Sequence, residues 1–331
     1  MKGQIYLPWK DWSADQYLGS SEFGEVYRIV KNRFGKEIYA VLRIIKIPSD
    51  YTESKRLQNL GITMKVYYRE ILDELLKELS ILESMRGMPN IAIQDDFVVQ
   101  ESGKTDGWVV YIRMELLANM NNYQKTYQMN MEQTIKMGID ICSALECYHQ
   151  QGIVYGKIKP SNIFISRYRK FKLGDFVTIP NLEKTRTSSA KEISLYQAPE
   201  ILKGQSENFT TDIYSLGMVL YQILNKGVLP QKDKAMSDPL WGDRQIGDIL
   251  RKACHADPKQ RYQTVRELKE ALQKVDIQRS NAVHQLQLDF TEQEPEEKQT
   301  GIFENYPGMF DEYLEECQKL RWYQRKKKRK R

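Results

Sequence analysis

Several short segments, in order along the chain, carry residue types suited to phosphate chemistry. A turn with two glycines, LGSSEFGEV at 18–26, precedes an apolar strand that contains AVLR at 40–43. Polar segments follow, YGKIKPSN at 155–162, LGDF at 173–176 and QAPE at 197–200. Glycines let a backbone bend tightly against a phosphate. A glycine turn alone is typical of an ordinary hairpin, so its meaning depends on the segments that follow it.

The elements that must position these segments change in type along the chain. Residues 13–48 favour strands, with β-branched residues concentrated at 37–47, and 107–117 favour another strand. Apolar residues at spacings of three and four predict a helix from about 63 to 85. After residue 120 the pattern is mostly helical. A strand-rich segment followed by a helix-rich one predicts two unlike lobes rather than a repeating βα array.

Taken together, the segments resemble those of Hanks-type serine/threonine protein kinases of the bacterial sort, over residues 12–276. The resemblance implies an α+β, bilobal fold with a small antiparallel sheet lobe and a larger helical lobe. It places the sheet lobe at 12–117 and the helical lobe at 118–276. The remaining residues, 277–331, are expected to be an acidic linker and a basic tail.

The resemblance also implies a nucleotide site. Asn162 and Asp175 would hold Mg²⁺. Asp212 would hold the backbone of the catalytic loop, and Glu200 and Arg261 would form a buried ion pair. The positions that would contact the nucleotide, or support its site, are Gly19, Gly24, Val26, Val41, Arg43, Glu78, Met114, Glu115, Leu117, Lys159 and Phe164.

The chain departs from the kinase pattern at the positions that perform phosphoryl transfer. The strand position that carries Lys in kinases is Arg43. The His-Arg-Asp motif reads Tyr155, Gly156 and Lys157, so a lysine stands where the catalytic Asp is expected. Ile193 takes the place of a hydroxyl that would bond that Asp. No catalytic position is intact, although Asn162 and Asp175 persist.

These losses lead to the hypothesis of a pseudokinase. An ammonium group has no lone pair with which to accept a proton, so Lys157 cannot act as a base. ATP binding is expected to be weak or absent, with a reduced dependence on Mg²⁺. Three alternatives stay open: an active kinase that transfers the ATP γ-phosphate with an unusual base, another group transfer from ATP, and an adaptor that binds through its basic tail.

The acidic residue Glu78 lies on an otherwise apolar helix stripe with Ile71, Leu75 and Leu82. An acid there is costly unless it is paired or reaches water. Two interpretations follow. Glu78 reaches solvent at the edge of the stripe, or it forms a salt bridge with Arg43, whose guanidinium suits a carboxylate.

Charge and composition limit the classes of partner. The net charge is +6, yet 321–331 carry eight basic residues and no acid, so the rest of the chain carries −2. This distribution argues against a general nucleic-acid binder. The tail is either a solvated extension or a segment that docks on an anionic membrane surface, on nucleic acid or on an acidic partner. We expect a protein partner as well, such as an active kinase. Four cysteines without metal spacing, and no signal or membrane-spanning run, predict a cytoplasmic protein with reduced thiols, held at the membrane surface where the tail docks.

Overall fold

The computed structural model describes residues 5–21, 24–47, 63–102, 107–174, 194–230, 236–240 and 243–275. The described residues form two compact units. The first contains those up to Leu116 together with Gly174, Ser194 and Leu195; the second contains Leu117–Leu173 and those from Tyr196 onward. The predicted linker and tail, 277–331, lie outside the described residues.

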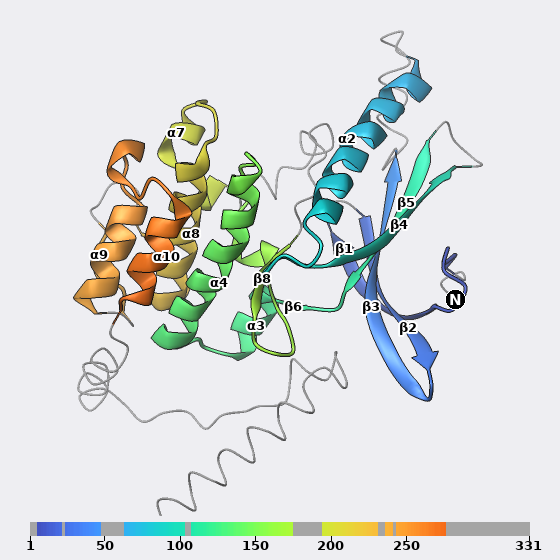
Figure 1. Cartoon of the computed structure of the whole chain (residues 1–331), viewed down its shortest axis with the longest axis horizontal. Helices are drawn as coiled ribbons and strands as arrows, with labels where there is room; N and C mark the ends of the chain where they lie inside the picture. Colours follow the sequence, from blue (N-terminus) through green and yellow to red (C-terminus); the bar gives the residue numbers. More distant parts are fainter. Residues whose placement is uncertain are drawn as a thin grey trace, which may run out of the picture. The chain divides into compact units, whose positions relative to one another are not determined.

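The first unit contains a five-stranded antiparallel sheet (Figure 1). Its strand order is β1-β2-β3-β5-β4, so only β5 and β4 depart from sequence order. The strands are β1 (Ser13–Ser21), β2 (Gly24–Arg33), β3 (Lys36–Ile47), β4 (Gln94–Glu101) and β5 (Trp108–Glu115).

One face of this sheet is covered by helix α2 (Met64–Ser84). Ile71, Leu75 and Leu79 point from the helix into a core that includes Ile45 and Val110 of the sheet, and all five side chains are buried. The 3.6-residue period of the helix places these apolar positions on one stripe. The helix ends at Ser84, as the apolar spacing predicts.

The opposite face of the sheet is covered by the segment that precedes β1. Trp9 and Trp12 pack against the apolar cluster on this face. The Trp9 indole N–H donates to Asp96 Oδ2 at 2.7 Å. The Arg113 guanidinium carbon lies 4.7 Å from the Trp9 ring centre and 5.3 Å from that of Trp12, within the range of cation–π attraction. Helix α2 and the segment before β1 therefore cover the two faces of the sheet.

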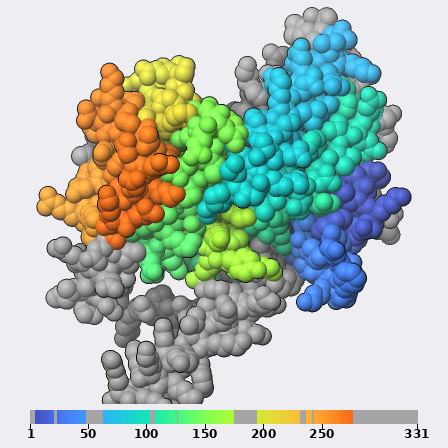
Figure 2. Space-filling view, in the orientation of Figure 1, coloured from blue at the N-terminus to red at the C-terminus, as the bar shows by residue number. Residues whose placement is uncertain are grey.

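The second unit is mainly helical. Helix α4 (Met131–Gln150) packs between α8 (Phe209–Leu224) and α10 (Val265–Gln273). Gly138 allows this approach, because a Cβ there would lie 2.9 Å from Leu272 Cδ1. The remaining elements are β6 (Ala118–Asn119), α3 (Met120–Thr126), η1 (Pro160–Asn162), β7 (Ile163–Ile165), β8 (Phe171–Leu173), α7 (Pro199–Leu202), α9 (Arg244–Ala253) and η2 (Pro258–Gln260). Figure 2 shows the side-chain surface of both units from the same direction.

These elements confirm the predicted α+β fold, with its antiparallel sheet lobe and its helical lobe. Strand β4 is the longest strand that sequence periodicity missed, and the short strands β6, β7 and β8 were missed as well. Asp95 and Asp96 interrupt the apolar alternation of β4, and the pairing register with β5 shifts between Gln94 and Asp96. A bulge of this kind removes the two-residue period that identifies a strand. The predicted lobe boundaries at 117/118 and 276/277 stay predictions.

Candidate functional site

The loop at 155–162 joins α4 to β7 and is anchored from below by a buried aspartate. Asp212, in the first turn of α8, is fully buried. Its Oδ2 accepts from the Tyr155 backbone N–H at 2.9 Å, and its Oδ1 accepts from the Gly156 N–H at 2.8 Å. His149 Nε2 also lies 2.8 Å from Asp212 Oδ2. The role predicted for Asp212, holding the loop backbone, is confirmed.

The far end of the loop is braced by its own side chains. Asn162 Nδ2 donates to the Lys157 carbonyl at 2.8 Å, and the Asn162 N–H donates to the Lys159 carbonyl at 3.0 Å. From β6, Asn119 Nδ2 donates to the Ser161 carbonyl at 2.6 Å. The amide of Asn162 therefore has a structural task in addition to its predicted one, and its Oδ1 is the atom suited to Mg²⁺.

The loop carries three residues that depart from the kinase pattern. Tyr155 is buried and packs edge-on against Tyr148, with ring centres 5.4 Å apart. Gly156 adopts a φ of +72°, a conformation that favours glycine. A Cβ at this position would lie 2.5 Å from Glu207 Oε2. The Glu207 carboxylate therefore occupies the space where a side chain at 156 would begin.

The two lysines of the loop differ in their surroundings. Lys157 is half-buried, whereas Lys159 is 7% exposed. A buried ammonium must be compensated by nearby polar groups or charges, so Lys159 is part of the packed loop. Lys157 is less buried, and solvent reaches part of its side chain.

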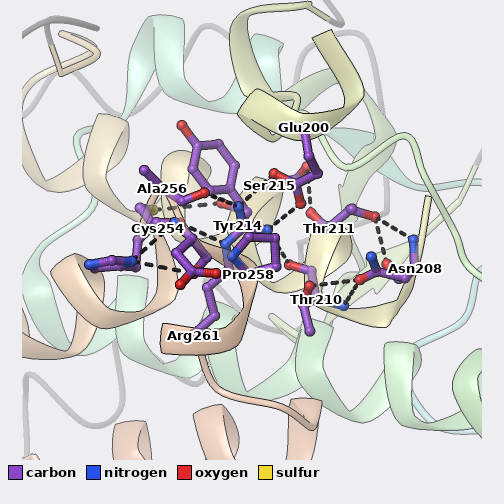
Figure 3. Close-up of polar contacts among 12 residues, drawn as sticks. Glu200, Asn208, Thr210, Thr211, Tyr214, Ser215, Cys254, Ala256, Pro258 and Arg261 are labelled. Atoms are coloured by element: carbon purple, nitrogen blue, oxygen red, sulfur yellow. Dashed lines mark hydrogen bonds and ion pairs between the residues drawn. The ribbon is translucent and has the colours of Figure 1, made fainter. Parts of the chain in front are cut away.

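A buried ion pair supports the region beside the loop, as the sequence predicts (Figure 3). The Arg261 guanidinium donates from Nη1 to Glu200 Oε1 at 2.6 Å and from Nη2 to Glu200 Oε2 at 2.7 Å. It also donates to the carbonyls of His255 and Thr210. Burial tends to raise the pKa of Glu200, but the hydrogen bonds from Arg261 outweigh it and hold that pKa below its usual range.

In the first unit, the predicted nucleotide positions lie on facing strands. Val26 of β2 is paired with Arg43 of β3, and Val41 of β3 is paired with Met114 of β5. Arg43 is 5% exposed, so its charged group lies inside the unit. Glu78 lies half-buried on α2. A salt bridge between Arg43 and Glu78 stays a prediction.

The two glycines near the β1–β2 turn differ in the space that surrounds them. Gly24 adopts a φ of +137°, and a Cβ there would collide with the backbone carbonyl of Ile44. Close packing of β2 on β3 therefore requires glycine at 24, whatever the turn binds. Gly19 also has a positive φ of +140°, but nothing lies within 4 Å of the Cβ position.

The remaining predicted positions fall into three groups. Glu115 is half-buried in the first unit and uses its carboxylate within the fold, accepting from the Ile93 N–H. Leu117 is buried and Phe164 is half-buried in the second unit. Asp175 and Ile193 lie outside the described residues. The site residues as a set stay predictions, because they belong to both units.

Sequence analysis missed two residues that contact the loop. His149 contacts Asp212, the aspartate that holds the loop, and this contact gives His149 a supporting role. Its position in the last turn of α4, just before the loop, was the available signal. Glu207 gave no signal in the sequence, because its proximity to Gly156 depends on how α8 packs beside the loop.

Other chemistries find little support in the described part of the chain. No group of three or more His, Cys, Asp or Glu residues in the described ranges is arranged to hold a metal ion. Cys142, Cys147 and Cys254 are free thiols, and burial raises the pKa of Cys254 to about 12. Within the described residues, no helix is long and apolar enough to cross a membrane.

An antiparallel sheet with one helix, followed by a helical unit whose loop is held by an α8 aspartate and flanked by a buried Glu–Arg pair, defines the protein kinase class of fold. The model of the protein kinase domain family matches residues 12–291, and the chain belongs to this family.

Its relatives carry the names of serine/threonine kinases, which supports the Hanks-type assignment. The chain is 31% identical over 163 residues to a probable serine/threonine-protein kinase of Clostridium perfringens, covering 44% of this chain and 24% of the relative. It is 30% identical over 163 residues to the serine/threonine-protein kinase PknB of Mycobacterium leprae, covering 44% and 26%. It is 36% identical over 104 residues to the proto-oncogene serine/threonine-protein kinase mos of Sus scrofa, covering 30% of each. The chain thus spans about a quarter to a third of the length of these relatives.

Proposed function

We propose that the chain is a pseudokinase, a kinase-fold protein that acts as a scaffold or an allosteric regulator through contact with a protein partner. One observation carries the proposal. The loop at 155–162 keeps the supports of a kinase catalytic loop, from Asp212 and Asn162, while Lys157 stands at the position of the base. If selection acts on the fold and no longer on catalysis, the supports of the loop are kept and the catalytic base is lost.

The chemistry at Lys157 sets the size of the expected loss. General base catalysis contributes roughly 10²–10⁴ in rate. A lysine ammonium donates three hydrogen bonds and accepts none, so it cannot deprotonate or orient a substrate hydroxyl. Gly156 removes a neighbouring side chain as well, and Glu207 fills the space beside it. A single restoration is therefore expected to recover little, because groups that act as a unit are not additive.

The test of inactivity is a transfer assay with labelled ATP and a generic protein acceptor. We expect neither autophosphorylation nor transfer by the purified chain, and little recovery in the Lys157→Asp variant. The Asp175→Ala variant, which lacks the predicted second metal ligand, is the matched control for background. Transfer by the natural chain that Asp175→Ala abolishes would establish the alternative, an active serine/threonine kinase.

Nucleotide binding is a separate part of the proposal. By the resemblance, Arg43, Lys157 and Lys159 would face the phosphates, where an active kinase presents two cations and an acid. A fixed ammonium attracts phosphate and repels Mg²⁺, and both effects grow as water is excluded. Asn162 Oδ1 still fits a metal–nucleotide complex, since Nδ2 is the atom that bonds Lys157. We therefore propose weak ATP binding that depends little on Mg²⁺.

A thermal-shift series measures this binding directly. The chain is heated without nucleotide, with ATP and Mg²⁺, and with ATP and a chelator. Ligand at about 100 times its Kd adds about 2.7 kcal/mol of stability. Stabilisation with both ATP samples supports the proposal. Stabilisation by ATP only when Mg²⁺ is present contradicts the proposal. No shift at millimolar ATP in either sample also contradicts it, and shows a chain that binds no nucleotide.

The proposed location is the cytoplasm, with the basic tail at 321–331 docking on an anionic membrane surface. Such binding is salt-sensitive, because exposed charges are screened beyond about 8 Å at physiological ionic strength. Sedimentation with anionic vesicles tests it. Equal sedimentation of the full chain and of a chain ending at Leu320 would exclude the tail as the anchor.

A further inference from the structure

Two hairpin turns, one in each unit, present an exposed aromatic ring among basic side chains. The β2–β3 turn carries Phe34 at its apex, and this side chain is 94% exposed. Arg33 and Lys36 flank the turn and are exposed as well. Figure 1 shows this hairpin extending beyond the neighbouring strands of its sheet. Single exposed apolar side chains are common on protein surfaces, so the conformation of this turn and the charges around the ring carry the argument.

The residues of this turn are poor choices for folding. Phe34 adopts a φ of +53°, a conformation that costs a bulky side chain roughly 1–2 kcal/mol and that Asn adopts more readily. Arg33 and Lys36 are directly opposite each other across the strands, where like charges repel. Positions that break local rules without a folding gain are where a function outweighs stability.

The turn is nevertheless well formed. The Gly35 N–H donates to Asn32 Oδ1 at 3.1 Å, and the β2–β3 pairing continues in register to Arg33 and Lys36. Seven consecutive residues, 32–38, are exposed. Phe34 therefore projects from a fixed, convex tip, and its exposure is a property of the turn.

The β7–β8 turn of the second unit repeats the pattern. Tyr168 is 65% exposed, and the Arg167 guanidinium carbon lies 4.7 Å from its ring centre. Arg169 adopts a φ of +53°, and the Lys170 N–H donates to Ser166 Oγ at 3.2 Å. No acidic residue occurs from 163 to 174. An exposed ring with basic neighbours thus occurs in both turns, with Arg33 and Lys36 in the first and three basic residues in the second, on unrelated strands.

An exposed ring surrounded by cations matches the chemistry of an anionic bilayer surface. Aromatic side chains insert at the level of the lipid headgroups, and basic side chains near the surface gain about fivefold in binding each from anionic lipid. Single-stranded nucleic acid also attracts rings and cations, but it binds along grooves and platforms on which several bases stack. A single ring on a convex tip favours the bilayer.

We propose that the β2–β3 and β7–β8 tips are interfacial wedges that bind an anionic phospholipid surface, with Phe34 and Tyr168 inserting among the headgroups. The proposal rests on described residues of each unit by itself. It requires neither the basic tail nor a nucleotide, so it stands or falls separately from the proposed pseudokinase function.

The test is sedimentation of the full chain with phosphatidylcholine vesicles that contain phosphatidylserine. The decisive variant is Phe34→Asn, which suits the turn better and should keep or raise the Tm. We expect its binding to fall about tenfold, since a large apolar side chain no longer leaves water. Leu240→Asn is the matched control, because Leu240 is 58% exposed but follows the acidic Asp238. This control should bind as the natural chain does.

Further arms of the experiment separate charge from insertion and membrane from nucleic acid. Tyr168→Asn should weaken vesicle binding as Phe34→Asn does. Neutralising Arg33 and Lys36 together, as glutamines, should weaken it about 25-fold. Vesicles of phosphatidylcholine alone should bind poorly. Unchanged vesicle binding by folded Phe34→Asn and Tyr168→Asn overturns the proposal, as does a loss confined to binding of a single-stranded oligonucleotide.

Discussion

The residues that support the 155–162 loop match the kinase pattern, whereas the residues at its reactive positions depart from it. Beneath the loop, Asp212 accepts hydrogen bonds from two backbone N–H groups, and the Glu200–Arg261 pair is fully hydrogen-bonded. On the loop itself, Gly156 and Lys157 replace the residue types of a working kinase. The two regions belong to the same unit, and Arg261 donates to the carbonyl of Thr210, two residues before Asp212.

The difference shows that folding and chemistry make separate demands on neighbouring residues. Asp212 and Arg261 are buried, so removing either leaves polar groups without partners inside the protein. Lys157 is half-buried, so we expect a change of its side chain to cost the fold less than a change at Asp212 or Arg261. A chain that gives up phosphoryl transfer while remaining folded would lose the second kind of residue and keep the first.

The largest effect on stability is expected from a substitution in the buried Glu200–Arg261 ion pair. Glu200→Gln leaves the Arg261 guanidinium buried without its counter-charge, and we expect a loss of about 3–5 kcal/mol in the free energy of unfolding. Denaturant unfolding at neutral pH measures it. Arg251→Ala, which breaks a half-exposed pair with Asp238, should cost no more than about 1 kcal/mol. Equal losses in the two variants would show that burial does not distinguish these pairs.

The second largest loss of stability is expected at Asp212, which holds the loop backbone. Asp212→Asn replaces one accepting oxygen by an N–H₂ group that faces other donors, and we expect a loss of about 2–3 kcal/mol. Lys157→Asp, on the anchored loop, should change stability by only about 0.5 kcal/mol. Comparison of the two unfolding curves tests whether support and chemistry are separable. A Lys157→Asp variant as unstable as Asp212→Asn would contradict the comparison.

Gly156 lies where the two regions meet. Gly156→Ala combines a positive φ with a methyl group 2.5 Å from Glu207 Oε2, and we expect a loss of about 1–2 kcal/mol. Truncating Glu207 to alanine as well should recover the part due to contact and leave the part due to the backbone. A double-mutant cycle measures the coupling. Strict additivity of the two changes would mean that Glu207 does not fill the space beside Gly156.

The smallest expected effect is in the pH dependence of stability. The pKa of Glu200 is lower in the folded chain than its ordinary value of 4.5, so the folded state binds this proton less readily than the unfolded state. The stabilisation is fully present above 4.5 and is lost as the pH falls through the folded value. The stability gap between the natural chain and Glu200→Gln should therefore narrow on acidification. A gap that stays constant with pH would exclude this linkage.

The sequence alone predicted the main helices and strands and showed at which positions the chain departs from the kinase pattern. Apolar spacing gave the limits of α2 to within a residue, because a helix that buries one face must repeat every 3.6 residues. The β-branched run at 37–47 likewise falls within β3. The resemblance to kinases assigned roles to Asp212, Glu200 and Arg261, and the structure bears these out. The identity of Lys157 predicts the loss of a base without any coordinates.

Only the tertiary structure decided which distant groups meet. Glu207 lies against Gly156, and the Ile44 carbonyl leaves no room for a side chain at 24. The Trp9 indole N–H donates to Asp96, and Trp9 helps to cover the face of the sheet opposite α2. Contacts of this kind join residues that are tens of positions apart, and hydrophobic periodicity reports only which face of an element is buried. Which partner covers that face is set by the packing of the whole unit.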